Sequence, residues 1–123
     1  MVYTNQYTMK EIENTVIRVR AHFTKKELDY PVLTTLYQKY NPQENIELFI
    51  TRSKELFPFL NCGLASLYLQ HIFGKGSIIN GSYKGYKHTF LLLSKNLIVD
   101  ITADQFGGPP YYIGSIIEPW DLQ

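Results

Sequence analysis

The sequence contains a single cysteine and only three histidines among its 123 residues. One cysteine excludes an internal disulfide and any metal site built from several cysteines, and it is compatible with a reducing compartment. The three histidines, His22, His71 and His88, are not spaced as metal ligands, and the segment 74–77 is too short for a phosphate-binding loop. We therefore expect no metal and no other cofactor.

The sequence also has little net charge and no long apolar run. Its formal net charge is +1, without the basic excess typical of nucleic-acid-binding proteins. No apolar stretch approaches transmembrane length, and the first six residues lack the basic-then-apolar pattern of a signal peptide. We expect a cytoplasmic protein that contacts neither nucleic acid nor a membrane, although a domain cut from a longer exported chain would look the same.

The length and the apolar content predict one domain spanning residues 1–123. Hydrophobic residues make up 45% of the chain, enough for a core that buries roughly two-thirds of the unfolded surface. Ten tyrosines raise the aromatic content to 15%. They suit a surface that contacts a partner, and they suit a small core with a polar rim equally well.

Residues 1–60 read as a helical part. Thr8 and Glu11 have the spacing of a capping box, and the apolar residues that follow recur at helical spacing, at Ile12, Val16, Val19 and Phe23. A second helix is predicted over 32–40, because Pro31 suits a first turn. A third is predicted over about 43–56, where Pro58 stops it.

Residues 61–123 read as a cysteine-bearing helix followed by an antiparallel sheet. Asn61 is a favourable N-cap, so Cys62 falls in the first turn of a helix that ends near Phe73, before Gly74. Strands are expected over 88–93 and 97–101, joined by the loop 94–96, with a last strand over 111–116. Helices followed by an antiparallel sheet predict the α+β class.

The hairpin places two polar residues near each other. A three-residue loop centred on Lys95 puts Phe90 opposite Asp100, so that His88 and Asp100 lie diagonally on one face, about 7–8 Å apart at the backbone. A two-residue loop would put them on opposite faces. The face with Phe90 would then carry the cysteine helix, and the earlier helices would cover the other face.

Cys62, His88 and Asp100 together have the composition of a catalytic triad. A helix N-terminus favours the thiolate, a histidine can activate it and protonate the leaving group, and a carboxylate can orient the histidine. The oxyanion donor would be the backbone N–H of Cys62 or the side chain of Asn61. Each residue alone has a simpler interpretation, as core thiol, structural histidine or turn-forming aspartate; their joint placement favours catalysis.

These segments resemble the papain-like superfamily in its small bacterial forms. Asn61–Ser66 resembles its cysteine motif, His88–Leu91 its histidine motif, and 98–106 a recurring ending in which the strand-end aspartate precedes a substrate-side loop. The resemblance covers 61 to about 114 and implies a papain-like core. It also implies a peptidase, glutamine deamidase or transglutaminase-like acyltransferase, in some cases delivered as a toxin. The family's oxyanion glutamine has no counterpart here, since Leu56 and Phe57 occupy that region.

Two functions remain open from the sequence. The first is a thiol enzyme that acts on a peptide bond or a glutamine side chain through an acyl-enzyme, with a protein or peptide as substrate. Asp104, Gln105, Phe106 and Tyr111 would then shape the substrate cleft, unless they only form a rigid loop. The second is a binding module, of the immunity or adaptor kind, on the same scaffold. A cognate inhibitor or toxin would be a further partner.

Overall fold

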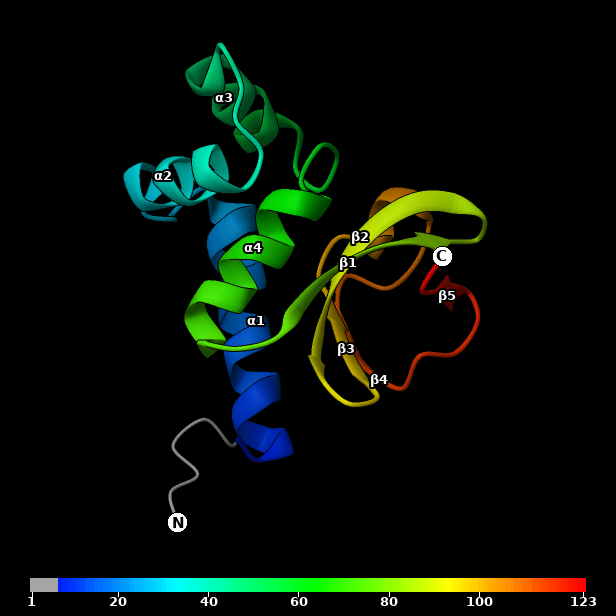
Figure 1. Ribbon diagram of the computed structural model, residues 1–123. Helices are drawn as coiled ribbons and strands as arrows, with labels where there is room; N and C mark the ends of the chain where they lie inside the picture. Colours follow the sequence, from blue (N-terminus) through cyan, green and yellow to red (C-terminus); the bar gives the residue numbers. More distant parts are fainter. Residues whose placement is uncertain (1–6) are drawn as a thin grey trace.

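The computed structural model describes residues 7–123 as an α+β fold, with four α-helices followed by a five-stranded antiparallel sheet. The helices gather beside the sheet, which is strongly curled (Figure 1). The α-helices are α1 (Met9–Lys25), α2 (Tyr30–Tyr40), α3 (Ile46–Leu56) and α4 (Cys62–Phe73). The strands are β1 (Ser77–Tyr83), β2 (Tyr86–Ser94), β3 (Leu97–Asp100), β4 (Tyr112–Gly114) and β5 (Trp120–Asp121), and the 3-10 helix η1 (Ala103–Phe106) follows β3.

The helix ends follow the local sequence closely. Thr8 and Glu11 form the predicted capping box, and the four predicted apolar positions of α1 are all buried. Asp29 caps α2, which begins at Tyr30, two residues before the predicted start. Helix α3 is shorter than predicted because Asn45 caps it, its side chain accepting a hydrogen bond from the backbone N–H of Leu48. Gly74 ends α4 in the left-handed conformation, as expected.

The sheet has the strand order β4-β3-β2-β1-β5, and every neighbouring pair is antiparallel. A two-residue turn, Lys84-Gly85, joins β1 to β2. The strand predicted over 111–116 is β4, which is shorter than predicted, and β5 was not predicted at all. Its pairing with Ser82 and Tyr83 of β1 brings the end of the chain back across the sheet.

The two faces of the sheet are covered by different parts of the chain. Leu91 and Val99 pack in one core with all four helices, including the buried residues of α4. Phe90 and Ile98, on the opposite face, pack with Tyr83, Ala103 and Trp120 inside the curl of the sheet. The earlier helices therefore cover the face predicted for them, but the prediction for the cysteine helix is wrong: α4 joins them there, and the returning C-terminal segment covers the face that had been assigned to it.

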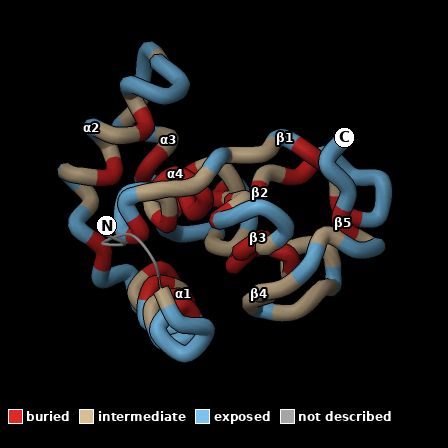
Figure 2. Tube along the Cα trace, turned by 60° about the horizontal axis from the view of Figure 1, so that its bottom comes forward, coloured by how far each residue is buried: buried red, intermediate tan, exposed pale blue. Residues whose placement is uncertain are grey.

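Helix α4 lies at the centre of the molecule. Its buried residues, red in Figure 2, lie between the other helices and the strands. At its first turn Cys62 is half-buried, and of its residues only His71 and Ile72, near its end, are exposed. In the described part of the chain, no helix is both long and apolar enough to span a membrane.

Candidate active site

Cys62 is fixed in place by the residue before it. The side chain of Asn61, which is 2% exposed, donates hydrogen bonds to the backbone carbonyls of Ser53 (2.8 Å) and Phe59 (2.7 Å). It makes no capping bond to its own helix. An amide has two N–H donors, so both are used in tying α4 to the end of α3. This placement does not support the predicted oxyanion role of Asn61. The backbone N–H of Cys62 stays a candidate donor, because the first N–H groups of a helix have no partner within the helix.

The β2–β3 hairpin places His88 and Asp100 on one face, as the sequence predicts, but its turn length and strand register differ from the prediction. The connecting turn has two residues, Lys95 and Asn96, rather than three. A bulge between Leu92 and Ser94 shifts the register by one residue, so that Leu91 still pairs with Val99. Asp100 and His88 therefore remain on one face of the hairpin.

His88 and Asp100 form a buried pair. The distance between His88 Nε2 and Asp100 Oδ2 is 2.6 Å, and each residue is 2% exposed. Two further residues hold the carboxylate. Trp120 donates its indole N–H to Oδ2 at 2.8 Å, and Thr102 donates its backbone N–H to Oδ1 at 2.9 Å. The orientation of the carboxylate is thus determined from three directions.

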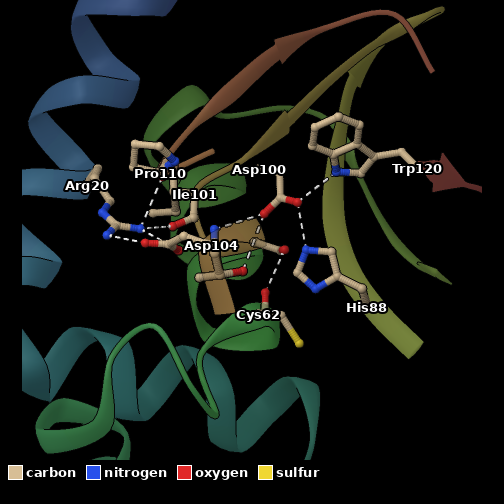
Figure 3. Close-up of polar contacts among 10 residues, drawn as sticks. Arg20, Cys62, His88, Asp100, Ile101, Asp104, Pro110 and Trp120 are labelled. Carbon is tan, nitrogen blue, oxygen red and sulfur yellow. Dashed lines mark hydrogen bonds and ion pairs between the residues drawn. The ribbon is translucent and has the colours of Figure 1, made fainter. Parts of the chain in front are cut away.

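The His88 ring lies between the carboxylate and the thiol. Its second nitrogen, Nδ1, is buried and has no hydrogen-bond partner of regular geometry among the described residues. Figure 3 shows this side of the ring turned toward the sulfur of Cys62. One ring nitrogen therefore contacts a carboxylate and the other faces a nucleophile, the arrangement that general-base catalysis by histidine requires.

The charges of the thiol and the ring support each other. Burial opposes the imidazolium, but hydrogen bonding to Asp100 and then the interaction with Cys62 raise the pKa of His88 from 6.5 to about 9. Burial also opposes the thiolate, yet His88 and the backbone N–H of Thr89 outweigh it and lower the pKa of Cys62 from its ordinary 9.0. Both shifts favour the charged forms, the thiolate and the imidazolium, which is the direction of an ion pair.

Cys62 lies where two open grooves meet. The hairpin groove has a volume of about 750 Å³ and is lined by Cys62, Asn80, Gly81, Ser82, Gly85, Lys87, His88, Thr89 and Gln123. The aromatic groove has a volume of about 620 Å³ and is lined by Tyr37, Tyr40, Asn41, Phe49, Leu60, Cys62, Gly63, Asn80 and Thr89. Both grooves include Cys62, Asn80 and Thr89, so they adjoin at the residue that carries the thiol.

None of the four residues predicted to bind substrate lines either groove. Asp104 forms a two-point ion pair with Arg20 of α1, at 2.7 Å and 3.0 Å. Phe106 packs edge-on against the His88 ring at 5.2 Å between centroids. Gln105 is half-buried, and its amide nitrogen has no hydrogen-bond partner within residues 7–123. Tyr111 lines a separate hollow beside Met9 of α1. Their placement supports the alternative reading of this segment as a structural loop.

Two residues of the site were not found from the sequence. Thr102 stands two residues after a strand-end aspartate, where an Asx turn is a recognisable pattern, so a local signal existed. Trp120 is the only tryptophan, but nothing local indicates that it reaches Asp100 from 20 residues away. Its position depends on the unpredicted strand β5.

No cluster of three or more His, Cys, Asp or Glu side chains suited to a metal ion occurs within residues 7–123. The chain matches no protein-family model, no curated protein and no solved structure. The site is therefore interpreted from its own geometry.

Proposed function

We propose that this chain is a thiol enzyme with a papain-like core that acts on an amide bond through Cys62, His88 and Asp100. One observation carries the proposal. A buried histidine contacts a fixed carboxylate through Nε2 and turns Nδ1 toward a thiol that opens on two grooves. A merely structural histidine would normally satisfy both nitrogens when it is buried.

The reaction that this geometry supports begins with attack of the Cys62 thiolate on an amide carbonyl. The backbone N–H of Cys62 stabilises the oxyanion, and His88 donates its proton to the leaving nitrogen. Water then attacks the thioester with His88 as general base, which releases the acid and restores the thiol. Hydrolysis of a peptide bond and deamidation of glutamine share these steps, and an amine in place of water gives acyl transfer.

The alternative of a binding module would be favoured by a thiol enclosed in apolar side chains. Cys62 is instead half-buried at the junction of two grooves, which argues for the enzyme. A cytoplasmic, reducing location, action as a toxin domain, and control by a cognate inhibitor belong to the same proposal. A nucleophilic thiolate works only while it stays reduced.

The test is the rate of Cys62 alkylation by iodoacetamide between pH 4 and 9. In the native protein we expect rapid labelling that persists well below pH 9.0, because the thiolate is stabilised. The His88→Ala variant should lose the low-pH labelling. The exposed His71 provides the matched control, and His71→Ala should label like the native protein.

Incubation with casein, followed by mass spectrometry, then separates the reactions. New peptide termini indicate hydrolysis, and a mass increase of about 1 Da at glutamine with ammonia release indicates deamidation. Labelling that rises only near pH 9.0 and is identical in His88→Ala would overturn the proposal.

A further inference from the structure

The two grooves share a cross-strand pair beside the thiol. Asn80 of β1 and Thr89 of β2 line both grooves together with Cys62. They lie directly opposite each other in the antiparallel register of β1 and β2, so their side chains are on the same face of the sheet. Leu91, two residues after Thr89, shares that face and packs in the same core as α4. The pair is therefore on the side of the sheet from which α4 presents the thiol.

Asn80 and Thr89 are joined by a hydrogen bond that uses the single proton of a hydroxyl. The Thr89 hydroxyl donates to Asn80 Oδ1 at 2.9 Å. A hydroxyl can donate once and can also accept, whereas an amide side chain carries an acceptor at one position and N–H donors at the other. A half-turn of the Asn80 amide exchanges these two positions. Thr89 can thus give its proton to another acceptor and keep Asn80 as a partner.

The other acceptor within reach of the Thr89 hydroxyl is the sulfur of Cys62. Burial raises the pKa of the thiol, and hydrogen bonds from His88 and from the backbone N–H of Thr89 lower it; the Thr89 hydroxyl adds a smaller contribution in the same direction. A hydrogen bond to a charged acceptor is roughly twice as strong as one between neutral groups. Ionisation of Cys62 therefore favours transfer of the hydroxyl hydrogen bond from Asn80 to the sulfur.

The titratable groups around the thiol are few. Besides Cys62, the titratable side chains that line the two grooves are His88 and Lys87 of β2 and Tyr37 and Tyr40 of α2. His88, which Asp100 of β3 holds from behind, is the one whose charge acts on the thiol. The Thr89 hydroxyl is uncharged, so its effect can be separated from that of His88 by substitution.

We propose that Thr89 and Asn80 form a hydrogen-bond relay that stabilises the charged sulfur of Cys62. Beside the neutral thiol, the hydroxyl donates to Asn80 Oδ1. Beside the thiolate, it donates to Sγ, and Asn80 turns to donate an Nδ2 proton to Thr89 Oγ1, so that no proton leaves either residue. Thr89 contacts the reacting sulfur and is a catalytic residue, whereas Asn80 acts through Thr89 and is a positioning residue. This inference rests on the proposed function, since it adds two residues to the same site.

The test is the pH midpoint of iodoacetamide labelling, measured between pH 4 and 9. Thr89→Val keeps the side-chain shape and the backbone N–H but lacks the hydroxyl donor, and its midpoint should rise by about 0.5 pH unit, or about threefold in thiolate at low pH. The shift is small because Thr89 is half-buried and Asn80 is exposed, so water competes for these bonds. Thr89→Ser restores a hydroxyl and should restore the native midpoint. The matched control, Thr35→Val on α2, removes a hydroxyl that bonds to the carbonyl of Pro31 outside both grooves and should label as the native protein does.

Asn80→Asp tests the part played by Asn80. A carboxylate only accepts hydrogen bonds, so in this variant it retains the Thr89 proton, and its added charge raises the midpoint whatever stands at position 89. Thr89→Val should therefore add less than about 0.2 pH unit in the Asn80→Asp background, compared with about 0.5 in the native background. Should Thr89→Val fail to fold, Thr89→Ala makes the same comparison.

The outcomes separate this inference from the proposed function. An unchanged midpoint in Thr89→Val, or a shift of the same size in the native and Asn80→Asp backgrounds, would overturn the relay even though low-pH labelling of the native protein upheld an activated thiol. Native labelling that rises only near pH 9.0 would remove the proposed function itself, and the relay with it.

Discussion

At the scale of single residues, Asp100 is the most heavily bonded side chain of the site. Its Oδ2 atom receives both His88 and the Trp120 indole, and its Oδ1 atom receives the Thr102 backbone N–H and hydroxyl. A buried carboxylate needs such partners to stay charged. Trp120 is therefore a positioning residue, which acts on the thiol through Asp100 and His88.

Trp120→Phe tests this role. The change keeps an aromatic ring against Tyr112, whose centroid lies 3.9 Å away, and removes only the indole donor to Asp100. We expect a loss of about 1–3 kcal/mol in the free energy of unfolding, because a buried acceptor loses a partner. Iodoacetamide labelling at pH 6 should slow as the His88 orientation loosens. Tyr112→Phe, which removes a hydroxyl bonded to Ser115 and not to Asp100, should leave labelling unchanged.

The pH dependence of the reaction follows from His88. Its pKa of about 9 means that the imidazolium, the proton donor to the leaving nitrogen, is lost as the pH rises through that value. Because the pKa of Cys62 is lowered, the thiolate is lost only on the acid side. Activity should therefore be bell-shaped, with its basic limb near pH 9.

Asp100→Asn checks the source of that limb. An asparagine can still accept from the ring but carries no charge, so burial should prevail and the His88 pKa should fall by at least about one unit. NMR titration of the imidazole resonances measures this directly. An unchanged His88 pKa in the variant would show that Asp100 does not sustain the imidazolium.

At the scale of secondary-structure elements, the hairpin shows what a sequence pattern can and cannot determine. The alternation of residues predicted that His88 and Asp100 share a face, and this is confirmed. The turn length was wrong, because a bulge near Leu93 supplies the extra residue that the loop lacks. Bulges leave little local signal, whereas the need to bury one face of each strand is visible in the sequence.

Helix α1 is joined to the loop after β3 by Arg20. Its guanidinium binds Asp104 at two points and also donates to the carbonyls of Ile101 (2.7 Å) and Pro110 (3.1 Å). Arg20→Ala should lower the free energy of unfolding by about 1–3 kcal/mol, mainly through the unpaired carbonyls, since the ion pair itself is partly exposed and screened. Urea denaturation measures the loss.

The same variant distinguishes a structural loop from a substrate loop. Iodoacetamide and a peptidyl chloromethyl ketone should label folded Arg20→Ala at native rates, because Arg20 and Asp104 line neither groove. The exposed Arg18, also on α1, is the matched control, and Arg18→Ala should change neither stability nor labelling. A selective loss of peptidyl labelling in Arg20→Ala would restore Asp104 to the substrate site.

At the scale of the whole molecule, the order of the helices and of the central strands, and the placement of His88 beside Asp100, could be predicted because they follow local patterns, such as helical spacing at Ile12 and Val16 and strand alternation around Phe90. Which segments pack on each face of the sheet could not be predicted. It depends on Trp120 reaching Asp100 and on Arg20 reaching Asp104, contacts over 20 and 84 residues in sequence. Such contacts are set by the packing of distant segments and leave no periodic signal.

The helical part and the sheet part are separate in sequence but not in space, because the helices and one face of the sheet share a hydrophobic core. Phe23 of α1 is 4% exposed and belongs to the same core as Leu91 and Val99. A core shared by the helices and one face of the sheet predicts that the two parts unfold together. Helix content followed by circular dichroism at 222 nm and the fluorescence of Trp120 on β5 should give coincident urea transitions.

Phe23→Ala makes this prediction sharper. The truncation lies entirely in the helical part, and a buried phenylalanine typically costs about 3–5 kcal/mol of unfolding free energy when cut to alanine. If the core is shared, the Trp120 fluorescence transition moves by as much as the helical one, although Trp120 belongs to the other core cluster, inside the curl of the sheet. A tryptophan midpoint that stays in place while the helical midpoint falls would instead divide the chain into two folding units. The His88–Asp100 pair would then be able to form without the helices that build the aromatic groove.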